Sequence, residues 1–176
     1  MSERFDSKFV NNCRAILETL RDICAESSNP PVEPAIFNMI SFALERMNPE
    51  NMIKYYANET HKYWDKVAEH DESFICSNVE LVINSIKIDD SMRDLILSII
   101  NSHKMAEVVK LMKLSDKRLK QQGTPDEDLN LNYVWRAMES LVRLSIKYTI
   151  AERTKDSKAV PGATYDLADM AARWIK

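Results

Sequence analysis

The most apolar helical pattern in the chain runs from residue 133 to residue 151. On a helix, at about 100° per residue, its apolar positions cover more than half of the circumference. The centre of this apolar arc is formed by Val134, Met138, Leu141, Val142 and Tyr148. The polar stripe is narrow and consists of Arg136, Glu139, Ser140, Arg143 and Lys147. Because so little of this helix can face water, we expect it to be the central helix of a bundle, over about 132–152.

Apolar residues also recur at helical spacings of three and four along most of the remaining chain. This pattern predicts helices over 3–26, 34–47, 49–68, 74–86, 89–100 and 167–175, with a loop over 154–163. It continues through 102–121, and the sequence leaves open whether 90–121 is one helix or two. The result is a bundle of seven or eight helices.

Several residues mark where these helices begin and end. Asn48 is a predicted cap, with Pro49 in the first helical position, where its missing N–H is not needed. Gly123 is expected to close the helix that precedes it. The segment from Thr124 to Glu127 has the form of a capping box, which would allow the central helix to begin as early as Pro125.

Glycine is scarce, and this narrows the fold class. The 176 residues include two glycines, against about a dozen at average usage. Hairpin-rich sheets need glycine in tight turns, and α/β nucleotide-binding folds need it beside phosphates. A hydrophobic fraction of 45% is enough for a sizeable core. We therefore predict one all-α domain over 1–176.

The chain has no feature of a membrane or secreted protein. It contains no run of 18 apolar residues, and its first residues are charged and lack an apolar signal core. Cys13 and Cys24 lie on one predicted helix, roughly 16 Å apart, and therefore cannot form a disulfide with each other. We expect Cys13, Cys24 and Cys76 to be buried free thiols in an intracellular, reducing compartment.

Candidate enzyme sites rest on three histidines, and none forms a convincing pattern. No histidine follows a glutamate by three positions, so the bundle-type di-iron site is absent. His61 and Asp65 are read as a solvated surface pair. His70-Asp71 is the dipeptide of metal-dependent phosphohydrolases, with His61 and Asp94 as nominal further ligands, but Asp71 is better explained as a helix cap. We expect no catalytic residue, no metal and no cofactor.

A basic stripe between residues 104 and 120 is the most distinctive surface feature. Six positive and two negative residues leave a local excess of four positive charges, although the whole chain carries −3. Four lysines fall within about 80° of helix arc, opposite Val108 and Met112. They are Lys110, Lys113, Lys117 and Lys120. This lysine ridge is either a solvated helix face or a contact for phosphates or an acidic protein.

The last predicted helix ends in two large apolar residues, Trp174 and Ile175. Chain termini usually fray, so two large apolar side chains at this position would be exposed to water unless they pack against something. They either pack back on the bundle or dock a partner in the helix-in-groove manner.

Two segments, HKYWDKVAEHDESFI (His61–Ile75) and YVWRAMESLVRLSIKYTIAERT (Tyr133–Thr154), resemble small helical proteins of large nucleocytoplasmic DNA viruses. The resemblance covers about a fifth of the chain and carries no site residues. It implies an intracellular viral protein, in the host cytoplasm or associated with the virion. Viral Bcl-2-like modulators are similar in architecture alone, because this chain lacks their Asn-Trp-Gly-Arg signature.

Taken together, these patterns favour a non-enzymatic interaction or structural protein that binds another protein or itself. A helical modulator that binds a partner helix in a groove is the first alternative. A nucleic-acid-associated protein that uses the lysine ridge is the second, with weak non-specific binding expected. A metal-dependent hydrolase comes last.

Overall fold

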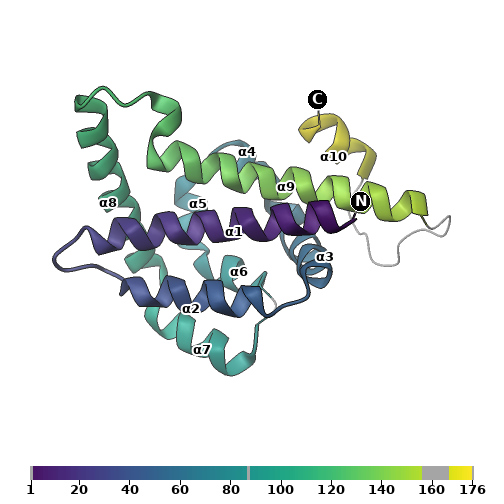
Figure 1. Cartoon of the computed structure of the whole chain (residues 1–176), viewed down its shortest axis with the longest axis horizontal. Coiled ribbons are helices and arrows are strands. Elements are labelled where there is room, and N and C mark those ends of the chain that lie inside the picture. The colour runs from purple at the N-terminus through teal and green to yellow at the C-terminus, as the bar shows by residue number, and fades with distance from the viewer. Residues whose placement is uncertain (1, 87, 156–166, 176) are drawn as a thin grey trace.

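Two long antiparallel helices, α1 (Ser2–Ala25) and α9 (Asn130–Lys155), lie side by side through the middle of the molecule (Figure 1). The computed structural model describes residues 2–86, 88–155 and 167–175, and none of these residues forms a β-strand. The all-α prediction is confirmed. The predicted central helix is α9, but it shares the centre of the domain with α1 and is not the sole axis of the bundle.

The remaining helices surround this pair. Their bounds are α2 (Pro34–Glu45), α3 (Pro49–Thr60), α4 (Trp64–Ala68), α5 (Glu72–Ser77), α6 (Val79–Asn84), α7 (Asp90–Ile99), α8 (Ser102–Gln121) and α10 (Leu167–Trp174), with 3-10 turns η1 (His61–Tyr63) and η2 (Asp126–Asp128). Within the described residues, seven of the α-helices have at least seven residues, and the shorter α4, α5 and α6 bring the number of α-helices above the predicted seven or eight. Helix α2 follows α1 on the side away from α9, and α8 crosses the end of α1 (Figure 1).

The predicted orientation of α9 is correct. The residues at the centre of its apolar arc are buried or half-buried, with Val142 fully inaccessible and Tyr148 1% exposed. On the opposite side, Arg136 and Lys147 are exposed. The helix also buries Ser145 and Thr149, which the pattern did not predict. Their hydroxyls donate to backbone carbonyls one turn earlier, so no polar group is left unpaired.

Two of the predicted helices are interrupted. The segment over 49–68 forms α3 and α4, separated by the 3-10 turn η1. The segment over 74–86 is divided at Asn78, whose backbone (φ −126°, ψ 38°) leaves the helical region. The Asn78 side chain donates to the carbonyl of Phe74 at 2.8 Å. Asparagine offers the backbone this local alternative to helix, which explains the break.

The open question over 90–121 is settled in favour of two helices. Ile100 and Asn101 are extended, and the side chain of Asn101 accepts the backbone N–H of Lys104 at 2.9 Å. Asn101 is therefore the N-cap of α8. Asn48 likewise caps α3, as predicted, by accepting the N–H of Asn51 at 3.1 Å.

The end of α8 and the start of α9 differ in how well the sequence predicts them. Gly123 has φ +87° just after α8, the left-handed conformation predicted for a closing glycine. The predicted capping box, by contrast, is wrong. Residues 126–128 form η2, without a side-chain cap, and α9 begins only at Asn130. The predicted loop over 154–163 lies outside the described residues, apart from two positions that continue α9.

The α9 N-terminus is capped by a residue from another helix. Asp116 of α8 is 8% exposed, and its carboxylate accepts the backbone N–H groups of Asn130 at 2.8 Å and Leu131 at 3.0 Å. A negative group at a helix N-terminus is also favoured by the helix dipole. Asp116 therefore fixes both the start of α9 and its position against α8.

The core is divided into one large and two smaller apolar clusters. The largest joins α1, α2, α3, α6, α7, α8 and α9, and contains Phe9, Ile53 and Leu141. No helix in the described part of the chain is both long and apolar enough to cross a membrane.

Candidate docking groove

His61 and Asp65 each have a structural partner and do not form a site together. The Nδ1 atom of His61 lies 3.1 Å from the Ala57 carbonyl oxygen, while Asp65 pairs with the guanidinium of Arg173. Among the described residues, no group of three or more His, Cys, Asp or Glu side chains is placed to hold a metal ion.

The His70-Asp71 dipeptide forms a helix junction. The Asp71 carboxylate accepts the N–H of Phe74 at 3.0 Å, which confirms its predicted role as a cap. His70 has φ +52° and stacks on Trp135, with ring centroids 4.8 Å apart and planes within 8°. Its Nε2 atom also contacts the carboxylate of Glu139. These contacts attach the end of α4 to α9.

The three cysteines are free thiols with weak acidity. Burial raises the pKa of Cys13 to about 12 and also raises the pKa values of Cys24 and Cys76. Because the thiolate is the reactive form, none of these groups is activated as a nucleophile at neutral pH. Cys24 is buried as predicted, whereas Cys13 and Cys76 are half-buried.

The lysine ridge is exposed along its whole length, but carboxylates neutralise most of it. Lys113 Nζ lies 2.7 Å from Glu72 Oε1, and Lys120 lies 3.8 Å from Asp126. Lys110 pairs with Glu107 at 3.6 Å. Lys117 has no carboxylate within ion-pair distance in the described part of the chain. Within the part of the chain that the structure describes, the ridge is thus a series of ion pairs with Lys117 as its one unpaired cation.

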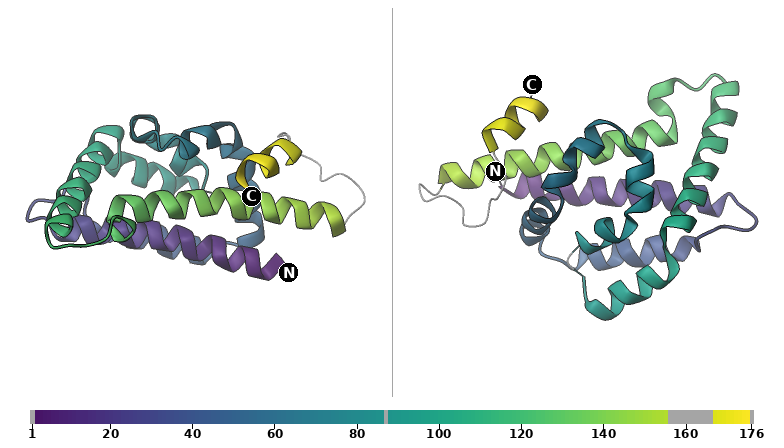
Figure 2. Two further views of the ribbon diagram at one scale, coloured as in Figure 1. Left: turned by 90° about the horizontal axis from the view of Figure 1, so that it is seen from above. Right: turned by 180° about the vertical axis from the view of Figure 1, so that it is seen from behind.

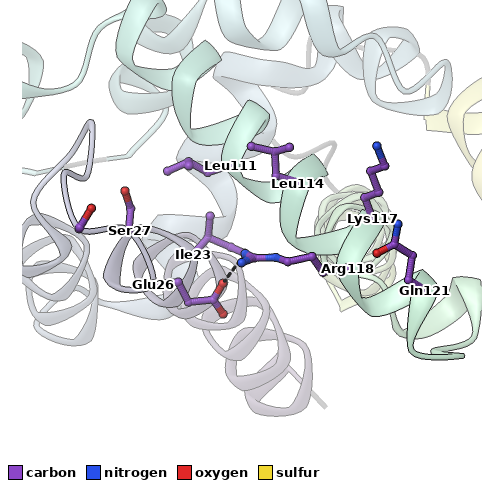
Figure 3. Close-up of a pocket in the computed structure, with 9 residues that line it drawn as sticks. Ile23, Glu26, Ser27, Leu111, Leu114, Lys117, Arg118 and Gln121 are labelled. Carbon is purple, nitrogen blue, oxygen red and sulfur yellow. Dashed lines mark ion pairs between the residues drawn. The ribbon is translucent and has the colours of Figure 1, made fainter.

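Lys117 stands on the edge of a groove between the end of α1 and the second half of α8. The groove has a volume of about 590 Å³ and lies on the surface of the bundle. Its apolar residues are Ile23 from α1 and Leu111 and Leu114 from α8 (Figure 3). Its polar rim is formed by Glu26, Ser27, Ser28, Lys117, Arg118 and Gln121.

Leu114 is the most unusual residue of this groove. It is 58% exposed, a larger fraction than that of any other large hydrophobic residue among the described positions. It lies on α8 within about 60° of Leu111 and Lys117, on the same side as the rim charges. Arg118 reaches across to Glu26 at 3.8 Å, as the dashed line in Figure 3 marks. An apolar side chain is therefore presented to water between charged groups.

The sequence pattern does not predict a functional role for Leu114. In the helical pattern, Leu114 falls on the same side as Lys110 and Lys117, away from the apolar side of Val108 and Met112. This position is the one indication that the sequence offers. Single exposed apolar residues are common, so this signal alone does not identify a site. The opposing wall from α1, with Ile23 and Glu26, depends on tertiary packing.

Trp174 and Ile175 are half-buried and pack against a small core cluster. The buried residues of that cluster are Ala57, Trp64, Val67, Val142 and Ile146. This position is the one expected if the last helix packs back on the bundle. These two residues and the lysine ridge are thus not brought together in one site.

Comparison of the chain with protein-family models, with curated proteins and with solved structures finds no match in any of the three.

Proposed function

We propose that the chain is a non-enzymatic interaction protein whose α1/α8 groove binds an acidic amphipathic helix of a partner protein. The observation that carries this proposal is the exposed Leu114 in a groove of about 590 Å³. An apolar residue presented to water between charged side chains lowers solubility, and a partner that covers it removes this cost. The helix-in-groove mode requires such an apolar floor with a polar rim.

The charges of the rim favour an acidic partner. Lys117 lacks a carboxylate partner among the described residues, and the Arg118–Glu26 pair is solvent-exposed. Exposed ion pairs contribute little, so a partner carboxylate can compete with Glu26 for Arg118. A carboxylate opposite Lys117 and a second opposite Arg118 would complement the rim and orient the bound helix.

The length of the groove sets the pattern expected in the partner. Its α8 wall extends from Leu111 to Gln121, roughly 15 Å or three helical turns. Two or three apolar anchors at positions i, i+4 and i+7 match this length. The proposed partner segment is therefore a short helix with apolar anchors on one face and acidic residues on both flanks.

A selection from a displayed library of helical peptides tests this proposal. We expect the selected peptides to carry the apolar anchors with acidic flanks. Their affinity for the Leu114→Glu variant should be at least tenfold lower than for the unchanged protein. Leu95→Glu on α7 is the matched control, because Leu95 is also exposed, at 46%, but lies outside the groove. Peptides that bind both variants as tightly as the unchanged protein would refute the groove as the binding site.

The resemblance to helical proteins of large DNA viruses extends the proposal. It suggests a virion or assembly component, in which this groove would join the chain to another protein of the particle. A Bcl-2-like modulator would use the same helix-in-groove mode, so the identity of the bound partner distinguishes the two.

Nucleic-acid binding is a separate prediction for the lysine ridge. Carboxylates lie beside three of its four lysines and lower the positive potential that phosphates would meet. We expect duplex DNA to bind no tighter than about 10⁻⁴ to 10⁻⁶ M at physiological salt, measured by fluorescence anisotropy. A nanomolar dissociation constant would instead make nucleic-acid binding the leading proposal. In that case, replacing Lys110, Lys113 and Lys117 together by alanine should flatten the dependence of log affinity on log salt concentration by about three units.

A further inference from the structure

An apolar cavity of about 230 Å³ lies within the bundle, and we propose that it binds a small uncharged apolar molecule. The cavity is lined by α5 and α6 together with residues of α1, α2, α3, α4, α8 and α9. Seen from behind, the short helices α5 and α6 lie in front of α1 (Figure 2). Its lining includes no residue of the α1/α8 groove, so this site is independent of the proposed docking function.

The chemistry of the lining excludes a charged ligand. Most of the surrounding side chains are aliphatic or aromatic, including Leu17, Ile75 and Val109. Three polar side chains of the lining already donate to backbone carbonyls of the protein. Thr60 donates to the Tyr56 carbonyl at 2.7 Å, Asn78 to that of Phe74 at 2.8 Å, and Ser85 to that of Val82 at 2.5 Å.

Glu72, the charged residue of the lining, is paired with Lys113 at the surface. In this mostly apolar lining, a ligand with polar groups would find few replacements for its hydrogen bonds to water. An apolar ligand has no hydrogen bonds to water to lose, and it gains contacts with the walls of the cavity.

The size of the cavity indicates the size of the ligand. Protein interiors are close-packed, and voids larger than a water molecule are few. An engineered apolar cavity of about 150 Å³ in another protein stays dry and binds benzene. A space of about 230 Å³ therefore admits a single aromatic ring with a short alkyl group.

The cover of the cavity supplies a route of entry. Helix α5 has six residues and no buried side chain, although Phe74, Ile75 and Cys76 line the cavity. Short elements with few buried contacts open at low free energy. Local opening of α5, next to the break at Asn78, lets a ligand pass without unfolding the central pair.

Toluene and phenol are the matched probes, since they are similar in size and differ in one polar group. Titration calorimetry of the whole protein should give one toluene site. Thermal unfolding at ten times the measured dissociation constant should show a Tm raised by about 3–6 °C. Phenol should bind at least tenfold more weakly, because moving its hydroxyl from water into a mostly apolar lining is costly. The absence of toluene binding, or equal binding of phenol, would overturn the inference.

Two substitutions at one position locate the site. Cys76→Phe fills the cavity and should abolish toluene binding, whereas Cys76→Ala keeps the space and should retain it. Val109→Phe provides the same test from α8 if Cys76→Phe does not fold. Toluene binding that persists in a folded, cavity-filled variant would place the ligand elsewhere and contradict the assignment. The comparison of toluene with phenol on the unchanged protein is valid whatever the variants do.

Discussion

Replacement of Leu141 by alanine should lower the free energy of unfolding by about 2–5 kcal/mol. Leu141 is 5% exposed and belongs to the largest core cluster, between α9 and its neighbours. Truncation loses the transfer free energy of the side chain and leaves a cavity. Leu141 also borders the internal cavity, so the new space joins an existing void rather than being closed by collapse. Urea denaturation measures the change.

The matched control is Arg143→Ala, two residues further along the same helix. The Arg143 side chain is 38% exposed, and its guanidinium lies 3.7 Å from Glu139. Exposed pairs of this kind contribute little, so the change should be about 0.5 kcal/mol or less. Equal losses at the two positions would mean that the apolar face of α9 is wrongly oriented.

Removal of the Asp116 carboxylate should have the second largest effect. We expect Asp116→Ala to cost about 1–3 kcal/mol, which combines the loss of a cap with two unsatisfied backbone donors. Asn130 and Leu131 would keep their N–H groups at the α9 N-terminus without an acceptor. Hydrogen exchange should then increase first in the opening turn of α9, because that turn loses its attachment to α8.

Two variants separate capping from charge. Asp116→Asn retains one acceptor oxygen and should lose less stability than Asp116→Ala. Asp126→Ala removes an exposed carboxylate that lies 3.8 Å from Lys120, and should be nearly neutral. If Asp126→Ala were as destabilising as Asp116→Ala, the capping of α9 would come from η2 and not from α8.

Local sequence determines much of this fold, and the reasons are visible in single elements. The apolar repeat of α9 extends over five turns, and a pattern of this length determines which face of the helix is apolar. Asn48, Asp71 and Gly123 act on backbone groups within a few residues of themselves. Such caps and stops can be predicted because both partners lie in one short segment.

Two of the failures involve partners that lie outside the local segment, and the third is a local competition with the helix. The start of α9 is set by Asp116, fourteen residues before Asn130, and not by the adjacent Thr124–Glu127 segment. The continuity of the helix predicted over 74–86 is lost at Asn78, where a side-chain hydrogen bond competes with the helix. The lysine ridge has Glu72 of α5 as a partner, which no spacing on α8 could reveal.

The groove shows the same limit most clearly. Leu114 alone is an exposed leucine on a basic helix face. It becomes part of a candidate site because α8 crosses the end of α1 and brings Ile23 and Glu26 opposite it (Figures 1 and 3). Sequence periodicity identifies which face of a helix is buried, but it does not say which helix lies opposite that face.

Photo-crosslinking in the cells that make the protein tests the proposed docking groove most directly. A benzophenone side chain would replace Leu114 in one variant and Leu95 in the other, both at exposed positions. The account predicts a defined protein adduct from position 114 and none from position 95, with the crosslinked peptide mapping to an acidic amphipathic helix. Equal adducts from both positions, an adduct to nucleic acid, or none at position 114 would contradict it.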